Sequence, residues 1–266
     1  MCMNLIREVL YKETGILCEG SRKPSLRNKI MAHIQSLGID INEYVELLKE
    51  DVNEKQRLIE LVTVNETYFF RNFPQLQGFA EQVLPFYLKK KQKKFLRIWS
   101  AACSTGEEPY TLSIILREMM DDFENWKIEL FGTDIDTHAL EIARKGEYGF
   151  RSIKNVPTMY LEKYFIPKGR YWQISPEIQH SVVFSNLNLI DQAAMATMQE
   201  FDFIFCRNVL IYFSLPAAKK TLAAFKQSLR PGGFLFLGSS ESVPRIDNSF
   251  QLMKFNDFWG YHKPEE

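Results

Sequence analysis

Residues 95–109 read FLRIWSAACSTGEEP, and this run changes character twice. The mostly apolar residues 95–100 predict a buried strand, and the small residues that follow predict a loop. Pro109 is typical of the first turn of a helix, which is predicted to continue to Met120. A strand that leads through a short loop into a helix is the repeating unit of a parallel sheet. Ligands of such sheets bind beyond the carboxyl ends of the strands, so this loop is the first candidate site.

The same order of elements continues along the chain. Further strands are predicted at 128–131, 182–184, 201–205, 234–237 and 258–261, and further helices at 137–145 and 216–229. Strands and helices that alternate in this way predict an α/β fold, with a parallel sheet covered by helices on both faces.

The first 62 residues have a different rhythm. Apolar residues recur at helical spacing, as at Leu26, Ile30 and Ile34, which predicts a small helical domain. No acid occurs between residues 21 and 35, a stretch that contains the basic residues Arg22, Lys23, Arg27 and Lys29. Such a basic run is either a solvated helix face or a docking surface for an acidic helix.

The composition excludes several classes of protein. The 266 residues include 33 basic and 33 acidic side chains, and 45% of the residues are apolar. This balance argues against a disordered chain and against a dedicated nucleic-acid binder. The four cysteines and four histidines show no metal-ligand spacing, so no metal site is expected. Neither a signal peptide nor a membrane-spanning run is found, and we expect a cytoplasmic protein.

Two carboxylates distinguish the first loop from a phosphate-binding loop. Gly106 is its only glycine, and Glu107 and Glu108 stand where a dinucleotide fold presents bare amides to pyrophosphate. These acids would repel phosphate and attract a cation, which favours S-adenosylmethionine because it carries an ammonium and a sulfonium but no phosphate. The alternative is that both glutamates only complement the dipole of the helix that follows.

Polar residues also follow the next three strands. Asp134 ends the second strand and is assigned to the ribose of an adenosine cofactor, while Asp136 is assigned to capping the next helix. Asn188 and Asn208 follow the third and fourth strands, where either could bind a cofactor or serve as a turn residue. Because four successive strands each end in a polar residue at the expected binding edge, a site is predicted there.

The segment 63–73 carries three consecutive aromatic residues between the helical region and the sheet. In a helix, Thr67 and Arg71 would share one face. The segment is either an aromatic hinge that packs the two regions together or a lid that turns Arg71 toward the cofactor.

These motifs resemble those of the CheR-type chemotaxis receptor methyltransferases over nearly the whole chain. Five motifs carry the resemblance, in this order along the sequence: Asn65-x-Thr67-x-Phe69-Phe70-Arg71, Ser104-Thr105-Gly106-Glu107-Glu108-Pro109-Tyr110, Thr133-Asp134-Ile135-Asp136, Asn188-Leu189, and Phe205-Cys206-Arg207-Asn208-Val209-Leu210-Ile211-Tyr212-Phe213. The resemblance implies a helical N-terminal domain at 1–62, a linker at 63–75 that contributes to the cofactor site, and a Rossmann-like class I methyltransferase domain at 76–266. It also implies a small β-subdomain inserted at 146–180.

The resemblance further implies roles for individual residues, with S-adenosylmethionine as cofactor and S-adenosylhomocysteine as its product. The implied cofactor contacts are Asn65, Thr67 and Arg71 from the linker, Glu107 at the charged methionine end, Asp134 at the ribose, Asn188 and Leu189 beside the adenosine, and Arg207 and Asn208 in the rest of the pocket. Arg71 and Tyr212 would lie nearest the transferred methyl, and Arg71 would align either the substrate carboxylate or the carboxylate of the cofactor.

The implied substrates are glutamate side chains in the cytoplasmic methylation helices of chemoreceptors, which the basic residues 22–29 would contact. Because a carboxylate with a pKa near 4.3 is already ionised at pH 7, no general base is required. Members that tether to a receptor pentapeptide carry a longer glycine-containing loop than Lys168-Gly169-Arg170, so we expect a tether-independent enzyme. We also expect it to act as a monomer. The alternatives are a methyltransferase for nucleic acid or a small molecule, and a non-catalytic adaptor.

Overall fold

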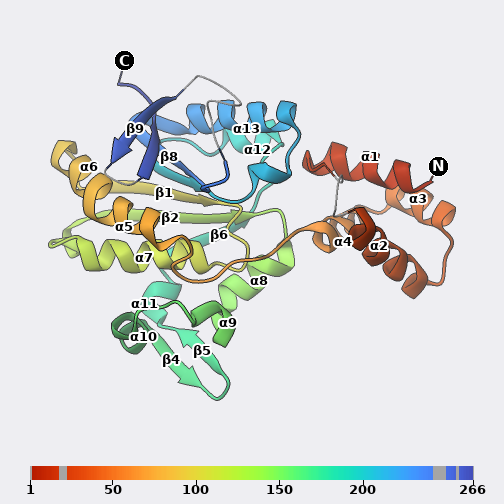
Figure 1. The fold of residues 1–266 in the computed structure, drawn as a ribbon, viewed down its shortest axis with the longest axis horizontal. Coiled ribbons are helices and arrows are strands. Elements are labelled where there is room, and N and C mark those ends of the chain that lie inside the picture. The colour runs from red at the N-terminus through yellow and green to blue at the C-terminus, as the bar shows by residue number, and fades with distance from the viewer. Residues whose placement is uncertain (1, 18–22, 242–249, 256–257, 266) are drawn as a thin grey trace.

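The N-terminal part of the molecule is a helical bundle that stands beside the rest of the chain (Figure 1). The computed structural model describes residues 2–17, 23–241, 250–255 and 258–265, except for the side chain of Lys23. The bundle consists of α1 (Cys2–Thr14), α2 (Lys23–Leu37), α3 (Ile41–Glu50) and α4 (Val52–Val62).

Local sequence explains where two of these helices begin. The Asp40 side chain accepts hydrogen bonds from the N–H groups of Asn42 and Glu43, and the Glu43 side chain accepts one from the Asp40 N–H, which forms a capping box at the start of α3. Asp51 caps α4 through its own side chain. The apolar faces of the helices meet in a core that contains Ile6, Leu10, Ile30, Ile34, Tyr44, Leu48 and Leu58.

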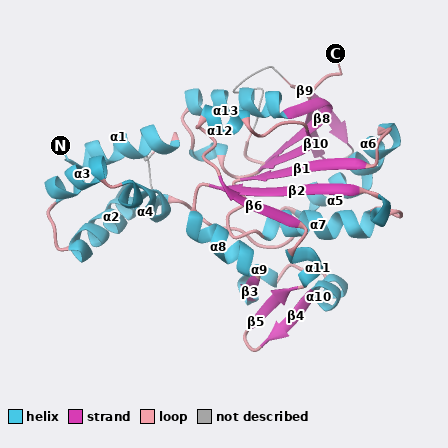
Figure 2. Ribbon diagram, turned by 180° about the vertical axis from the view of Figure 1, so that it is seen from behind, coloured by secondary structure: helices cyan, strands magenta, loops and turns pink. Residues whose placement is uncertain are grey.

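The larger part of the chain is built around a sheet with the strand order β6-β2-β1-β7-β8-β10-β9 (Figure 2). The strands from β6 to β8 in this order are parallel, and β10 runs antiparallel to both of its neighbours. The bounds are β1 (Phe95–Ala101), β2 (Lys127–Asp134), β6 (Val182–Asn186), β7 (Phe201–Cys206), β8 (Leu229–Leu237), β9 (Gln251–Phe255) and β10 (Phe258–His262).

Helices cover both faces of this sheet because side chains alternate along its central strands. Ile98 and Phe203 pack on the face covered by α5, α6 and α7, whereas Trp99 and Ile204 pack on the face covered by α12 and α13. The bounds are α5 (Phe73–Gly78), the π-helical turn η2 (Phe79–Val83), α6 (Leu84–Lys90), α7 (Glu107–Met119), the 3-10 turn η3 (Phe123–Asn125), α8 (Thr137–Lys145), α12 (Gln192–Ala196), the 3-10 turn η4 (Leu210–Tyr212) and α13 (Leu215–Ser228).

A small subdomain is inserted between α8 and β6. It contains β3 (Glu147–Gly149), α9 (Phe150–Ile153), α10 (Thr158–Tyr164), β4 (Phe165–Lys168), β5 (Tyr171–Ile174) and α11 (Pro176–Gln179). Its antiparallel strands have the order β3-β5-β4. Lys168 pairs with Tyr171, so the β4–β5 hairpin is closed by only Gly169 and Arg170.

The predicted α/β class, the helical N-terminal region and the inserted β-subdomain are confirmed. Helix α8 occupies the predicted residues 137–145, with Asp136 as its cap as expected. Residues 63–68 are not helical, so helical spacing is not what groups Thr67 with Arg71. In the described part of the chain, no helix is long and apolar enough to cross a membrane.

Candidate active site

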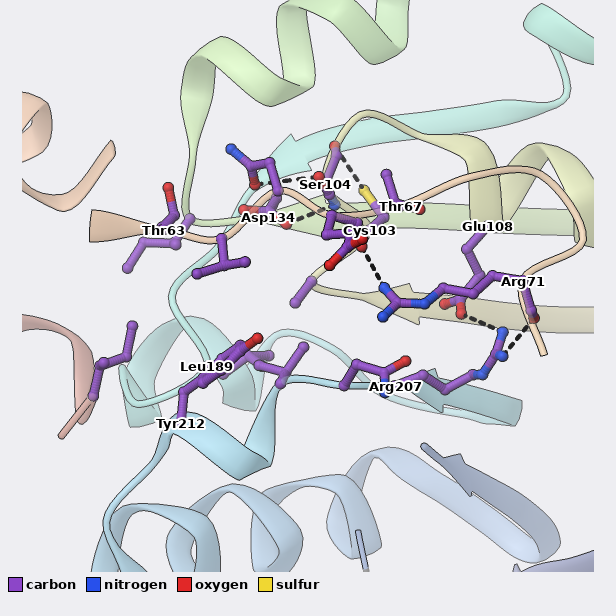
Figure 3. Close-up of a pocket in the computed structure, with 18 of the residues that line it drawn as sticks. Thr63, Thr67, Arg71, Cys103, Ser104, Glu108, Asp134, Leu189, Arg207 and Tyr212 are labelled. Atoms are coloured by element: carbon purple, nitrogen blue, oxygen red, sulfur yellow. Dashed lines mark hydrogen bonds and ion pairs between the residues drawn. The ribbon is translucent and has the colours of Figure 1, made fainter. Parts of the chain in front are cut away.

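A cavity opens at the carboxyl ends of β1, β2, β6 and β7 (Figure 3). The strand order runs outward in opposite directions from β1 and β7, and their junction is the switch point at which parallel sheets bind ligands. The cavity and its mouth together enclose about 1090 Å³ of empty space, which includes open solvent. Residues 62–68 and Arg71 cover it from the linker.

The loop after β1 is held in an unusual backbone conformation. Ala102 and Ser104 have φ values of 57° and 51°, a backbone region that residues other than glycine rarely adopt. Gly106 has φ 91°, and a Cβ there would lie 2.7 Å from the Cβ of Ala143. The close packing of this loop against α8 therefore requires the single glycine that the sequence retains.

Asp134 at the end of β2 faces the cavity and fixes the loop from below. Its carboxylate accepts hydrogen bonds from the N–H of Ser104 at 2.7 Å and from the N–H of Asp136 at 2.8 Å. Burial raises the pKa of Asp134 to about 6, although these two hydrogen bonds oppose the shift. Asp136 lies behind it, where it accepts hydrogen bonds from Thr63 and Asn65 of the linker.

The two glutamates of the first loop have separate positions. Glu107 is 1% exposed, and its carboxylate accepts hydrogen bonds from Thr105 at 2.6 Å and Ser152 at 2.9 Å. Burial raises the pKa of Glu107, and its side chain does not line the cavity. Glu108 does line it, whereas the contact implied by the resemblance is Glu107. Consecutive helical residues differ in direction by about 100°, so only one of the pair can face the cavity.

Two arginines enter the site from opposite sides (Figure 3). Arg207, just after β7, donates to Glu108 at 3.0 Å and to the backbone carbonyl of Arg71 at 2.6 Å. The Arg71 side chain extends across the cavity and donates to the carbonyl of Glu66. Phe70 and Asn72 have φ values of 58° and 56°, so a strained backbone residue lies on each side of Arg71.

The aromatic residues of the linker are divided between packing and the cavity. Phe69 and Phe70 are buried, and their rings stack or pack edge-on against Tyr148 and Tyr160 of the inserted subdomain. Tyr68 lines the cavity together with Thr67 and Arg71. The segment thus packs against the inserted subdomain and also carries part of the cavity wall.

The loops after β6 and β7 complete the wall. Asn188, Leu189, Asn208 and Tyr212 all line it, as does Asn65 from the linker. Asn188 donates to the carbonyl of Glu13 at 2.6 Å, so its amide nitrogen is engaged by the N-terminal bundle. Asn208 has φ 63°, a conformation that asparagine tolerates better than most side chains.

One supporting residue was missed by the sequence analysis. Glu241, after β8, accepts backbone hydrogen bonds from Gly238 at 2.7 Å, from Asn208 and Val209 at 2.8 Å, and from Ile211 at 3.3 Å. It lies 33 positions beyond Asn208, and nothing in the local sequence links the two. A carboxylate with several backbone donors is a strong anchor, so Glu241 fixes the loop that carries Tyr212.

Two polar atoms beside the cavity remain buried without a hydrogen-bond partner among the described residues. They are Nε of Arg207 and Oδ1 of Asn208, one a donor and the other an acceptor. Buried polar groups are ordinarily paired, so these atoms fit a bound molecule that carries both kinds of group. The cavity thus suits a polar cofactor such as S-adenosylmethionine.

Cys103 is the sulfur-containing residue of the wall (Figure 3). Burial raises the pKa of its thiol well above the usual value, and the nearby carboxylates of Asp134 and Glu108 raise it further. Cys103 therefore stays protonated. No cluster of histidine, cysteine and acidic side chains suited to a metal occurs in the described part of the chain.

The expected basic surface is only partly visible. Arg22 lies outside the described residues, and nothing is described of the Lys23 side chain. Arg27 is exposed on α2. Lys29 is also exposed, but its Nζ donates to the carbonyl of Leu61 at 3.2 Å and thereby caps the end of α4.

The sheet has this switch point, an acid ends β2, and the first loop carries carboxylates that would repel phosphate. Together these features define a class I S-adenosylmethionine-dependent methyltransferase. Within that class, the chain belongs to the CheR methyltransferase family. Residues 65–259 match the family's S-adenosylmethionine-binding domain, and residues 3–63 match its all-alpha domain.

Curated relatives resemble the chain over most of its length. Chemotaxis protein methyltransferase 2 of Vibrio cholerae is 37% identical, covering 98% of this chain and 92% of that protein. Chemotaxis protein methyltransferase 1 of Pseudomonas aeruginosa is 32% identical, covering 94% and 93%. Chemotaxis protein methyltransferase of Escherichia coli is 34% identical, covering 93% and 86%.

Proposed function

We propose that this enzyme transfers the methyl group of S-adenosylmethionine to glutamate carboxylates in the cytoplasmic methylation helices of chemoreceptors, giving glutamate methyl esters. The observation that carries the proposal is the convergence of Asp134, Arg71, Arg207 and Tyr212 on one cavity at the switch point of the sheet. The names of the relatives support the choice of receptor substrates.

The cofactor is assigned to this cavity residue by residue. Asp134 holds the ribose hydroxyls, because its carboxylate faces the cavity at the end of β2. The other proposed contacts are Asn65 and Thr67 from the linker, Asn188 and Leu189 beside the adenosine, and Arg207 and Asn208 on the remaining side. At the charged methionine end the proposed contact stays Glu107, whose carboxylate accepts hydrogen bonds from Thr105 and Ser152 in the structure. Glu108 lines the cavity, where it is paired with Arg207.

The chemistry requires alignment more than proton transfer. When bound, the cofactor would supply a methyl group on a positively charged sulfur. An ionised carboxylate oxygen can form a bond to the methyl carbon while the carbon–sulfur bond breaks and S-adenosylhomocysteine leaves. The protein must therefore orient the glutamate and exclude water from it. We assign the orientation to Arg71, whose guanidinium extends across the cavity and retains donors beyond its bond to Glu66. Tyr212 also lines the cavity.

A test of the Arg71 assignment separates the two possible carboxylate partners. Replacement by lysine keeps the charge but removes the planar pair of donors. If Arg71 aligns the substrate, Arg71→Lys lowers the maximal rate and leaves the dissociation constant of S-adenosylmethionine unchanged. A weaker cofactor affinity with an unchanged maximal rate would instead place Arg71 on the carboxylate of the cofactor.

Recognition of the receptor is assigned to the basic residues of the N-terminal bundle, Arg22, Lys23, Arg27 and Lys29. Methylation helices that present glutamates are acidic, so charge complementarity favours this surface. We further propose that the enzyme acts without a pentapeptide tether, because the β4–β5 hairpin is closed by only two residues. We also propose that it acts as a cytoplasmic monomer. Micromolar binding of a receptor's terminal pentapeptide in calorimetry would overturn the tether-independent part of the proposal.

The experiment that tests the function is transfer of radiolabelled methyl from S-adenosylmethionine to a purified cytoplasmic receptor fragment. Label should enter the fragment and be released by mild alkali, as expected for an ester. A fragment whose methylation-site glutamates are replaced by alanine is the matched control and should stay unlabelled. Cofactor binding without transfer would point to an adaptor, and transfer to nucleic acid or a small molecule alone would point to a different methyltransferase.

A further inference from the structure

The N-terminal bundle contributes directly to the cavity wall. Thr14, at the end of α1, and Ile16 both line the cavity. Helix α1 also places Ile6 and Leu10 in the core of the bundle, where both are fully buried. A single helix thus connects the core of the proposed receptor-binding domain to the cofactor site. We call residues 14–17 the Gly15 turn.

Backbone hydrogen bonds join the Gly15 turn to the loop after β7. The N–H of Leu17 donates to the carbonyl of Tyr212 at 2.8 Å, and the N–H of Ser214 donates to the carbonyl of Gly15 at 3.0 Å. Ile16 and Phe213 form an antiparallel bridge between these two bonds. Paired backbone bonds of this kind fix both position and direction, so the bundle holds Tyr212 by its main chain.

Side chains strengthen the same contact on both sides. The hydroxyl of Tyr11 lies 3.1 Å from the hydroxyl of Ser214, and the Asn188 amide donates to the carbonyl of Glu13. Ser214 is also the cap of α13. The end of α1 therefore touches the loops after both β6 and β7, each of which lines the cavity.

The residue at the centre of the turn has no room for a side chain. Gly15 has φ 70°, and a Cβ there would lie 2.8 Å from the Cβ of Ala217 and 3.0 Å from Cγ2 of Ile190. Both neighbours belong to the sheet domain and flank the cavity loops. Any larger residue must therefore lift the turn away from the methyltransferase domain.

We propose that the Gly15 turn is a positioning element of the active site, which holds Tyr212 in place and couples the receptor-binding bundle to the cofactor cavity. The inference rests on the proposed function and extends it, because it makes the N-terminal domain part of the methyl-transfer site. Binding of cofactor should tighten the turn, and a displaced turn should weaken both cofactor binding and turnover.

The test compares Gly15→Ala with Gly38→Ala in the full chain. Gly38 is the matched control because its φ is 71°, yet nothing lies within 4 Å of a Cβ at that position. Gly15→Ala is expected to raise the dissociation constant of S-adenosylmethionine in calorimetry by about tenfold or more and to lower the maximal rate at saturating cofactor. Gly38→Ala is expected to stay within about twofold of the wild type in both. Equal effects in the two variants, or no effect in either, would overturn the proposal.

A second measurement needs no variant, so it holds even if Gly15→Ala does not fold. In wild-type hydrogen exchange, S-adenosylmethionine alone should slow exchange of the Leu17 and Ser214 amides, while the Gly38 amide, which donates to the carbonyl of Gln35, should be unaffected. Unchanged exchange at Leu17 and Ser214 would overturn the coupling. The calorimetry and the hydrogen exchange use no receptor, so failure of the coupling is distinguishable from failure of the proposed methylation.

Discussion

At the scale of single residues, the acids of the site differ in what neutralises them. Glu108 is paired with Arg207. Asp134 accepts only backbone N–H groups among the described residues, so its charge stays available to a ligand. Its raised pKa shows that burial outweighs these two hydrogen bonds. A cofactor that donates hydroxyl groups and carries positive charge relieves that imbalance.

This balance makes cofactor affinity pH-dependent. The folded-state pKa of Asp134, about 6, lies above the usual aspartate value of 3.8, so the unliganded enzyme takes up a proton as the pH falls through 6. Ribose binding requires the ionised form, and the affinity for S-adenosylmethionine should therefore fall by about tenfold between pH 7 and pH 5. Asp134→Asn should bind about 10- to 100-fold more weakly at pH 7.5, with no inflection near pH 6.

Calorimetry across pH 5 to 8 measures both effects. Asp40→Asn is the control, since Asp40 caps α3, does not line the cavity and should leave the inflection near pH 6 in place. If the wild type showed a flat profile over this range, Asp134 would not be the ribose ligand.

Tyr212 provides a second prediction at the residue scale. Its ring lines the cavity, and its main chain is held by the Gly15 turn. Tyr212→Phe keeps the packing and removes only the hydroxyl, so turnover should fall about tenfold while the cofactor dissociation constant changes by less than about twofold. Single-turnover methyl transfer together with calorimetry would check this. Equal losses of rate and affinity would assign Tyr212 to cofactor binding instead.

At the scale of elements, the sequence predicted best where local signals agree. Helix α8 has a capping aspartate before it and Gly146 after it, and its predicted and observed bounds coincide. Residues 73–90 contain Pro74 and Pro85, and the helical elements α5, η2 and α6 of this range were not predicted. Strand β9 was also missed, because its side chains are mostly exposed and its pairing with β10 is a tertiary contact.

The same distinction applies to the elements that carry the site. The sequence predicted Asp134, Asn188 and Asn208 at the ends of parallel strands, and because such strands end at one edge of the sheet, all three line the cavity. The choice between Glu107 and Glu108 depends on where α7 begins and how it is rotated, which a pair of like residues does not reveal. Glu241 and Thr14 reach the cavity loops only through the tertiary fold, so no local pattern marks them.

Glu241 yields a prediction about the loop after β7. Glutamine at this position keeps the size of the side chain but loses the charge and one of the two acceptor oxygens that hold the loop. Glu241→Gln should therefore destabilise the protein by about 2 kcal/mol and lower the rate of methyl transfer. Thermal unfolding and transfer assays would measure both, with Glu200→Gln, an exposed partner of Arg230, as the control. A variant with unchanged stability and rate would show that the loop keeps its position without Glu241.

At the scale of the whole molecule, zero net charge conceals a separation of charge. The described part of α2 carries basic residues and no acid, whereas the cavity wall combines the acids Asp134 and Glu108 with two arginines. Reversal of the charge at Arg27 should weaken docking of the receptor and leave the cofactor site intact. The bundle lines that site through α1 and α4, whereas Arg27 lies on the exposed side of α2.

Arg27→Glu should lower the second-order rate for receptor methylation by about tenfold at low salt, and the difference from wild type should shrink as ionic strength rises. Lys220→Glu, an equivalent reversal on α13, is the control and should behave as wild type. Cofactor affinity should be unchanged in both variants. An Arg27→Glu enzyme as fast as wild type at low salt would remove Arg27 from the docking surface.

The buried thiol of Cys103 has a consequence for the durability of the enzyme. A methyl donor on sulfonium is an alkylating agent, and a thiolate in the cavity wall would compete with the substrate for it. Because burial and neighbouring carboxylates keep Cys103 protonated, the wall is chemically inert toward the reagent that it holds. The enzyme should therefore survive long storage with S-adenosylmethionine without gaining the mass of a methyl group at Cys103, which mass spectrometry can establish.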